Sequence, residues 1–197
     1  TCLYRVWKDS LLETRLRGLI NIFDKHILDT NGHLKLFFDN DWNCNYDIFS
    51  YGHDIEASWL LHESALVLGD AAELAKVEAR VPSIVKAASE GTAADGGMIY
   101  EKMGDHIDAD LHWWVQAEAV VGYFNLWEHF GDQTGLENAI NCWEYIKKDI
   151  IDHKNGEWVW SRRPDGSVNT VEDKAGFWKC PYHNGRMCLE IIERTAL

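Results

Sequence analysis

The feature that most constrains the fold is a helix, turn and strand unit that recurs about every 62 residues. Its turn markers, Asn31-Gly32, Asp95-Gly96 and Asn155-Gly156, are spaced 64 and 60 residues apart. In each unit an amphipathic helix precedes the turn, a short strand and a polar loop follow it, and a largely apolar helix comes next. This alternation indicates an outer ring of helices around an inner ring. The sequence therefore predicts an all-α fold, an α/α toroid with short β-hairpin-like loops between its helices.

The pattern predicts three outer and three inner helices. The outer helices are expected at about 10–28, 71–90 with a restart at Pro82, and 134–152, and the inner helices at 52–68, 110–130 and 182–192. Short strands are expected at 33–38, 98–100 and 158–160.

Three inner helices cannot close a ring, so their apolar faces would lie open on one side. A stable monomer rarely exposes such a surface. We therefore expect either a dimer across the gap or a chain that is half of a larger protein. The start at Thr1, already inside an apolar pattern, favours the second expectation.

Composition argues against several functional classes. The 197 residues include 19 Lys and Arg against 32 Asp and Glu, a net charge of −13. Nucleic acid and anionic membrane surfaces recruit clustered Lys and Arg, so neither is an expected partner. Polar residues interrupt the apolar runs before they reach the roughly 20 residues that a bilayer requires. The five cysteines form no C-x-x-C pair, which is typical of a soluble, cytoplasmic protein.

Polar and aromatic residues gather where the inner helices begin. Because each inner helix follows a turn and strand, the three N-termini are expected at one end of the toroid. That end would bring together His53, Glu56 and Trp59 from the first inner helix, Trp114 and Glu118 from the second, and Trp178 and His183 at the entry to the third. A pocket in which polar groups converge among aromatic rings is a default binding or catalytic site.

The aromatic residues suit sugar binding, because Trp and Tyr faces stack on the apolar patches of a pyranose. The chain contains ten tryptophans, and most are expected in the core. Structural explanations stay open for the polar residues as well, since acids are common at helix starts. Glu118, however, lies deep in an apolar helix and needs a partner there. The remaining histidines, His112 among them, are expected to be structural or on the surface.

Three motifs together resemble those of the N-acylglucosamine 2-epimerase family. They are YGHDIEASW at 51–59, WWVQAE at 113–118 and WKCPYHN at 178–184. The resemblance covers nearly the whole chain but only the C-terminal half of such an enzyme. It implies that residues 1–197 form the C-terminal half of a single (α/α)6-barrel domain.

The resemblance also implies an activity that needs no cofactor and no metal. Members of the family invert C2 of a reducing-end sugar through an open-chain cis-enediolate, here the glucose of β-1,4 disaccharides such as cellobiose. By this resemblance His53 and His183 would be the general acid/base pair, Glu56 and Glu118 would hold sugar hydroxyls and assist ring opening, and Trp59, Trp114 and Trp178 would form the stacking platform. The expected partners are a disaccharide substrate and the missing N-terminal half, without which we expect the chain to be inactive.

Three alternatives remain open. Glu56 and Glu118 could be the acid and base of a glycoside hydrolase on an α/α toroid. His53 and Glu56, with His183, offer nitrogen and oxygen ligands to a metal, although their spacing contains no tight ligand pair. A non-catalytic sugar-binding fragment would bind without turnover.

Overall fold

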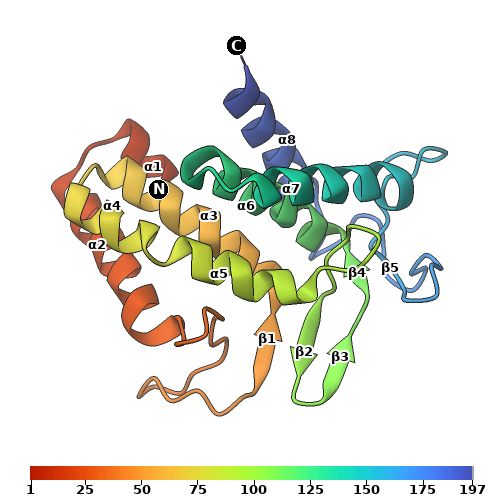
Figure 1. The fold of residues 1–197 in the computed structure, drawn as a ribbon, viewed down its shortest axis with the longest axis horizontal. Coiled ribbons are helices and arrows are strands. Elements are labelled where there is room, and N and C mark those ends of the chain that lie inside the picture. The colour runs from red at the N-terminus through yellow and green to blue at the C-terminus, as the bar shows by residue number, and fades with distance from the viewer. Residues whose placement is uncertain (197) are drawn as a thin grey trace.

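The computed structural model describes residues 1–196 and arranges its helices in two layers (Figure 1). The inner layer consists of α3 (Tyr51–Leu68), α6 (Trp113–Phe130) and α8 (Tyr182–Thr195). The outer layer consists of α2 (Ser10–Ile22), α4 (Ala71–Glu78), α5 (Val81–Ala88) and α7 (Gln133–Tyr145). α3 packs on α2, α5 and α6, and α6 packs on α7 and α8. The predicted alternation of outer and inner helices is confirmed.

Short elements complete the layers. α1 (Cys2–Val6) precedes α2, and the π-helical turns η1 (Phe23–Ile27) and η3 (Ile146–Ile150) extend α2 and α7 to the ends that the sequence predicts. The 3-10 turn η2 (Ser89–Gly91) extends α5. The chain restarts between α4 and α5, with Pro82 in the first turn of α5. A proline fits there because the first amides of a helix have no intrahelical acceptor.

The connections from α3 to α4 and from α6 to α7 share one pattern, a glycine followed by an aspartate. Gly69 and Gly131 end α3 and α6 in the left-handed conformation, with φ of 76° and 69°. Asp70 and Asp132 follow directly and accept hydrogen bonds from the first amides of α4 and α7. A glycine that ends one helix and an aspartate that caps the next make a tight reversal. The reversal folds each outer helix back along its inner helix.

The strands lie in the loops that lead to the inner helices. β1 (Ile48–Ser50), β2 (Glu101–Met103) and β3 (His106–Asp108) form an antiparallel sheet in that order, in which Phe49 pairs with Lys102. β4 (Leu111–His112) pairs with β5 (Ser161–Arg162). These pairings connect the loop before α3 to the loop before α6, and that loop to the segment before α8.

The strands predicted at 33–38, 98–100 and 158–160 are wrong. Each segment contains a single isolated bridge, Leu34 to Leu28, Met98 to Thr92 and Trp158 to Ile151. The turn folds each segment back onto the end of its own outer helix, and only one residue pair meets before the two paths separate. Ladder pairing resumes further along the chain, where different loops meet.

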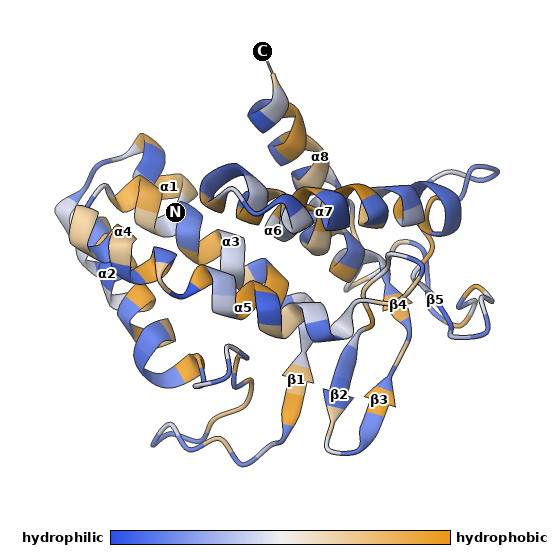
Figure 2. Ribbon diagram, in the orientation of Figure 1, coloured by the Kyte–Doolittle hydropathy of each residue, from blue (hydrophilic) through white to orange (hydrophobic). Residues whose placement is uncertain are grey.

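Two glycines let α3 and α6 approach closely. A Cβ on Gly122 would lie 2.6 Å from Ile55 Cγ1, and a Cβ on Gly52 would lie 2.5 Å from the Trp114 ring. The residues on either side of Gly122 in α6 are buried and apolar. Figure 2 shows hydrophilic and hydrophobic residues alternating along the outer helices α5 and α7. Gly52 therefore sets the Trp114 ring against the start of α3.

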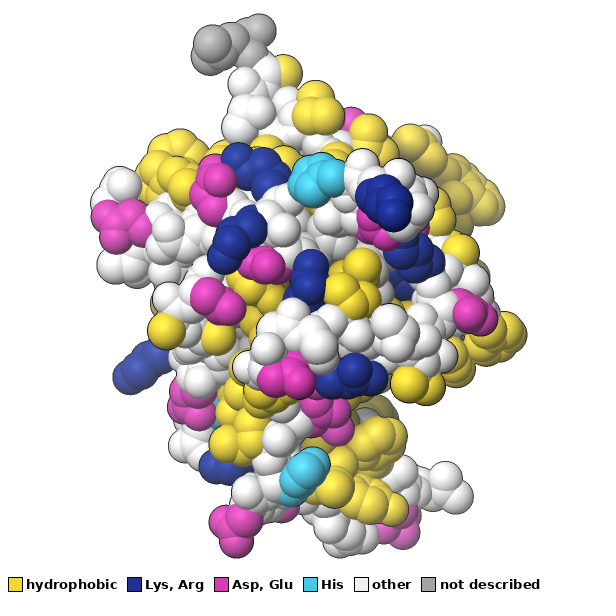
Figure 3. Space-filling view, turned by 90° about the vertical axis from the view of Figure 1, so that its right-hand side faces the viewer, with side chains coloured by type: hydrophobic (Ala, Val, Ile, Leu, Met, Phe, Trp, Pro, Cys, Tyr) yellow, Lys and Arg dark blue, Asp and Glu magenta, His cyan; other side chains and the backbone are white. Residues whose placement is uncertain are grey.

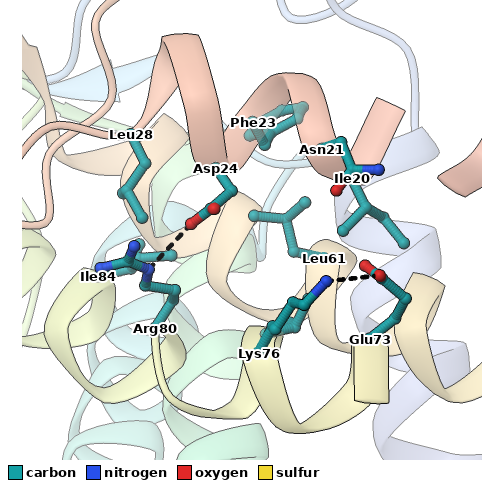
Figure 4. Close-up of a pocket in the computed structure, with 11 residues that line it drawn as sticks. Ile20, Asn21, Phe23, Asp24, Leu28, Leu61, Glu73, Lys76, Arg80 and Ile84 are labelled. Atoms are coloured by element: carbon teal, nitrogen blue, oxygen red, sulfur yellow. Dashed lines mark hydrogen bonds and ion pairs between the residues drawn. The ribbon is translucent and has the colours of Figure 1, made fainter. Parts of the chain in front are cut away.

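The outer helices meet in a contact that has no room for a ligand. Side chains of α2, η1, α3, α4 and α5, including Ile20 and Leu61, surround a space of about 30 Å³ (Figure 4). This is about the volume of one water molecule in the liquid. An exposed ion pair of 3.0 Å between Arg80 Nε and Asp24 Oδ1 crosses its edge.

A buried pair fixes the start of α3 to the turn before it. Asp54 Oδ2 lies 2.7 Å from His33 Nδ1, and Asp54 Oδ1 accepts a hydrogen bond of 2.8 Å from the Leu34 amide. Asp54 and His33 are both buried. Asp54 points away from the neighbouring His53, so this pair supports the helix that presents His53.

Replacing Asp54 with Ala is expected to lower the free energy of unfolding by about 3 kcal/mol, because His33 and the Leu34 amide lose their buried acceptor. Urea denaturation measures the loss. The matched control is Asp24→Ala, which removes the exposed pair with Arg80 and should cost less than about 1 kcal/mol. Equal losses in the two variants would contradict the structural role of Asp54.

The surface carries charge of both signs. On the face seen in Figure 3, Lys and Arg side chains are interspersed with Asp and Glu, and no basic patch forms there. Among residues 1–196, none of the helices combines the length and the hydropathy needed to cross a bilayer.

Apolar side chains remain exposed on the last inner helix, α8, and on the first outer helix, α2. Leu189 and Ile192 on α8 are 62% and 63% exposed, and Leu11 and Leu19 on α2 are 60% and 57% exposed. An apolar groove of about 350 Å³ runs between α6, α7 and α8. This exposure agrees with the expectation that three inner helices leave the ring open.

Candidate active site

An open cavity of about 480 Å³ lies where α3, α6 and α8 begin. Five of the predicted site residues line it, namely His53, Glu56, Trp114, Trp178 and His183. The expectation that the starts of the inner helices share one end is therefore confirmed. The other two predicted residues, Glu118 and Trp59, lie directly behind the cavity wall and are each 1% exposed.

Glu118 orients His183. His183 Nδ1 lies 2.6 Å from Glu118 Oε1. An ionised carboxylate only accepts hydrogen bonds, so His183 Nδ1 carries the proton in this contact. His183 Nε2 makes no hydrogen bond within residues 1–196, and in this tautomer it has a free lone pair. A histidine oriented in this way can take or return a proton at Nε2.

Arg186 joins the two carboxylates of the site. Its Nη2 lies 2.6 Å from Glu56 Oε1 and 2.7 Å from Glu118 Oε1. Glu56 and Glu118 come from α3 and α6, so one guanidinium on α8 connects all three inner helices. Burial raises the pKa of Glu56, the negative charge of Glu118 adds to the rise, and Arg186 opposes it. Glu56 is thus poised nearer to neutral pH than an ordinary glutamate.

His53 sits opposite on the first turn of α3. Ser50 Oγ lies 2.7 Å from its Nδ1, and the Trp114 ring lies 4.8 Å away between centroids. Surrounding side chains desolvate the imidazole and so lower its pKa, and the nearby His183 lowers it further. His53 is therefore neutral at pH 7, the form that a general base requires.

The three predicted stacking tryptophans have different positions. Trp178 is 78% exposed at the cavity rim, and Trp114 forms part of the wall beside both His53 and His183. Trp59 is buried, and its Nε1 donates a hydrogen bond of 3.0 Å to Glu118 Oε2. The stacking role expected of Trp59 is not supported, because its ring is covered. Trp59 instead holds Glu118 in position.

Residues of the site that the sequence did not indicate include His112, Tyr100 and Arg186. His112, expected to be structural or on the surface, lines the cavity and stacks on Tyr100 with centroids 4.1 Å apart and planes 8° apart. Only the loop pairing reveals this contact. Arg186 had a local signal, because it follows His183 by three residues and so shares its helix face.

The metal alternative does not fit the side chains present. Glu56, Glu118 and His183 offer one ligand atom each, and these atoms lie within 4.8 Å of one another. The guanidinium of Arg186 occupies the space between them, and a fixed cation there opposes a second one. A metal ion would have to displace Arg186.

Comparisons with known proteins agree with the fold. The family described as N-acylglucosamine 2-epimerase matches residues 3–185. A cellobiose 2-epimerase from Bacteroides fragilis is 61% identical over 98% of this chain and 50% of its own length. A sugar epimerase from a ruminal bacterium superposes with a TM-score of 0.95 at 38% identity, over 99% of this chain and 51% of that structure. Cellobiose 2-epimerase from Bacillus thermoamylovorans B4167 gives 0.91 at 40% identity, over 98% and 50%.

The chain belongs to the N-acylglucosamine 2-epimerase family. It spans about half the length of the relatives it matches. Its fold corresponds to half of an α/α barrel, as the sequence predicts.

Proposed function

We propose that this chain carries the two acid/base histidines of an epimerase that inverts C2 of the reducing-end glucose of cellobiose and similar β-1,4 disaccharides. One observation carries the proposal: His183, oriented by the buried Glu118, faces the same cavity as the neutral His53. Two bases on one cavity can serve opposite faces of one carbon. The name and 61% identity of the Bacteroides fragilis relative support the disaccharide.

The reaction proceeds on the open-chain sugar. Ring opening moves a proton from the C1 hydroxyl to the ring oxygen and creates an aldehyde. One histidine then removes the C2 proton, the electron pair of that bond forms the C1–C2 double bond, and the aldehyde oxygen becomes the enediolate oxygen. The second histidine, which is protonated on its substrate-facing nitrogen when this step begins, donates that proton to the opposite face of C2, and the aldehyde is restored. The first histidine keeps the proton that it removed, and both side chains exchange protons with solvent before the next turnover. The order in which His53 and His183 act depends on which epimer enters.

The carboxylates and aromatic rings assist these steps. Glu56, whose pKa is raised, can exchange a proton with a ring or hydroxyl oxygen during ring opening. Glu118 keeps His183 in its productive tautomer and stabilises the imidazolium that forms when Nε2 takes a proton. Trp114 and Trp178 offer ring faces on which the sugar stacks.

The hydrolase alternative is less well supported. An acid and a base for hydrolysis must reach the glycosidic oxygen and a water molecule. Glu118 is 1% exposed and accepts hydrogen bonds from Trp59, His183 and Arg186. Its oxygens are fully engaged, so it is suited to orient other groups. Release of free glucose without a 2-epimer would favour the hydrolase.

We infer that the active barrel needs a second half of similar length, since the relatives are about twice as long. The exposed apolar side chains of α2 and α8 are the surfaces such a half would cover. The test is a chimera in which the uncovered half of the Bacteroides fragilis relative is fused to residues 1–197. We expect the chimera to convert cellobiose to glucosyl-mannose, measured by chromatography, and the chain alone to bind cellobiose at most weakly and to form no product. An inactive, folded chimera would contradict the proposed function, and full activity of the chain alone would contradict the need for a second half.

The pH profile of the chimera should reflect His53. Because its pKa lies below the ordinary value of 6.5, His53 stays neutral as pH falls through 7, and the decline in kcat/KM should be centred below pH 6.5. Trp114→Ala admits water beside the imidazole, so the pKa should rise and the acid limb should move to higher pH. The measurement is kcat/KM between about pH 5 and pH 8, the range in which histidines titrate. An acid limb that Trp114→Ala leaves in place would argue against His53 as the titrating base.

A further inference from the structure

We propose that Arg186 is a positioning residue, a built-in cation that occupies what would otherwise be a metal site formed by Glu56, Glu118 and His183. This inference deepens the proposed function and rests on it for its kinetic test. The structural part of the inference is that Arg186 Nη2 lies between ligand atoms of Glu56, Glu118 and His183. It is tested separately from activity.

A single atom makes all the contacts. Arg186 Nη2 lies 2.6 Å from Glu56 Oε1, 2.7 Å from Glu118 Oε1 and 3.4 Å from His183 Nδ1. Glu56, Glu118 and His183 each offer one ligand atom, and these atoms lie within 4.8 Å of one another. His183 Nδ1 carries the proton, so its approach to Arg186 Nη2 is a close contact and not a hydrogen bond, and Nδ1 is a ligand only in the tautomer that carries the proton on Nε2. Two carboxylates and an imidazole are a ligand set that divalent transition metals accept. The guanidinium therefore supplies the positive charge that a metal ion would bring.

The Trp59 ring also contacts the guanidinium of Arg186. The guanidinium carbon lies 5.0 Å from the centroid of the Trp59 ring, within cation–π range. The same Trp59 donates to Glu118. Arg186 Nε is buried and has no hydrogen-bond partner within residues 1–196. The position of Arg186 is thus determined by its Nη2 contacts and by the Trp59 ring, since Nε contributes no hydrogen bond.

The consequence for the reaction is geometric. Arg186 keeps Glu118 beside His183 while Glu56, on α3, remains at the cavity wall. Without this cation, two carboxylates with oxygens within 4.8 Å of each other would repel each other and separate. Glu118 would then hold His183 less firmly, and the imidazole would lose its alignment with C2.

The chain offers a matched control on the same helix. Arg194 is eight residues after Arg186, and its guanidinium carbon lies 5.9 Å from the same Trp59 ring. It pairs with Glu190 and Glu128, however, and contacts neither Glu56 nor Glu118. Arg194→Ala removes a cation from the same face without touching the site carboxylates.

The kinetic test uses the active chimera. Arg186→Ala should lower kcat for cellobiose epimerisation about 100-fold with KM changed by less than about threefold, because alignment rather than binding is lost. Arg186→Lys, which restores a point charge, should recover about tenfold of kcat. Arg194→Ala should keep kcat within about threefold of the parent. A kcat for Arg186→Ala within threefold of the parent, or equal losses in the Ala and Lys variants, would overturn the positioning role. If Arg186→Ala does not fold, as judged by far-ultraviolet circular dichroism, Arg186→Lys takes its place. A kcat for Arg186→Lys about tenfold below the parent supports the positioning role, and a kcat within about threefold of the parent, as in Arg194→Ala, overturns it.

The structural test uses the 197-residue chain and needs no activity. Co²⁺ is titrated into the parent, Arg186→Ala and Arg194→Ala, and its visible absorption is recorded. We expect Arg186→Ala to gain a Co²⁺ site that binds about tenfold more tightly than any site in the parent. The double variant with Arg186→Ala and Glu118→Gln should lack this site. Co²⁺ absorption identical in the parent and in Arg186→Ala would overturn the assignment of Arg186 to a cation position. An inactive parent chimera with this gain in Co²⁺ binding would contradict the proposed function while supporting the assignment.

Discussion

Replacing His183 by Asn in the chimera is expected to lower kcat for 2-epimerisation by about 10³-fold, within the range typical of a lost general acid/base group. The Asn side chain can place an amide N–H where His183 Nδ1 now donates to Glu118, so the buried carboxylate keeps its partner. What is lost is Nε2, the nitrogen left free for the substrate. Far-ultraviolet circular dichroism should show the same fold.

The same variant should retain one half-reaction. His53 is intact in His183→Asn, so in D2O it should still exchange the C2 hydrogen of one epimer, although no inverted product accumulates. NMR of the recovered sugar detects this exchange. The control is His112→Asn, which changes a histidine of the same cavity whose side chain makes no hydrogen bond to a carboxylate among residues 1–196, and it should keep kcat within about fivefold. Unreduced turnover in His183→Asn would exclude His183 as an acid/base residue.

The second large effect is expected at Glu118. Glu118→Gln preserves shape but replaces one acceptor oxygen by an NH₂ group. Its carbonyl oxygen can serve either Trp59 or the pair formed by His183 and Arg186, since these donors contact different oxygens of Glu118. If the NH₂ group faces His183, it favours the tautomer with the proton on Nε2, which cannot act as a base. We expect kcat to fall by about 10³-fold, as when a histidine is held in the wrong tautomer.

Removing only the hydrogen bond to Glu118 Oε2 should have a smaller effect on kcat. Trp59→Phe removes only the donor to Glu118 Oε2 and leaves the contact between Oε1 and His183 in place. Its loss in kcat should be about tenfold, smaller than that of Glu118→Gln. A larger loss in Trp59→Phe than in Glu118→Gln, measured as initial rates at saturating cellobiose, would show that the indole has a direct role and would contradict the proposed chain of contacts.

Much of the fold could be predicted because it repeats. The recurrence of turns at Asn31, Asp95 and Asn155 indicates alternating outer and inner helices, and the apolar character of α3 and α6 identifies them as inner. The starts of the inner helices also share one end, as the topology requires. These features depend on local pattern, and local pattern is visible in a sequence.

The errors concern contacts between segments far apart in the chain. Strand positions depend on which loops meet, and β1 pairs with β2 across about 50 residues. The burial of Trp59 and the place of His112 in the cavity depend on how helices and loops pack, which residue spacing does not reveal. Arg186 was within reach of the helix pattern, but only the structure brings Glu56 and Glu118 to one side of it.

The most direct test of the central claim is the reaction of cellobiose with the chimera in D2O, followed by NMR. The two-histidine account predicts glucosyl-mannose with deuterium at C2 and an intact glycosidic bond, and loss of this product in both His53→Ala and His183→Asn. An inverted product that retains its original C2 hydrogen, or the appearance of free glucose in place of the 2-epimer, would contradict proton transfer by His53 and His183.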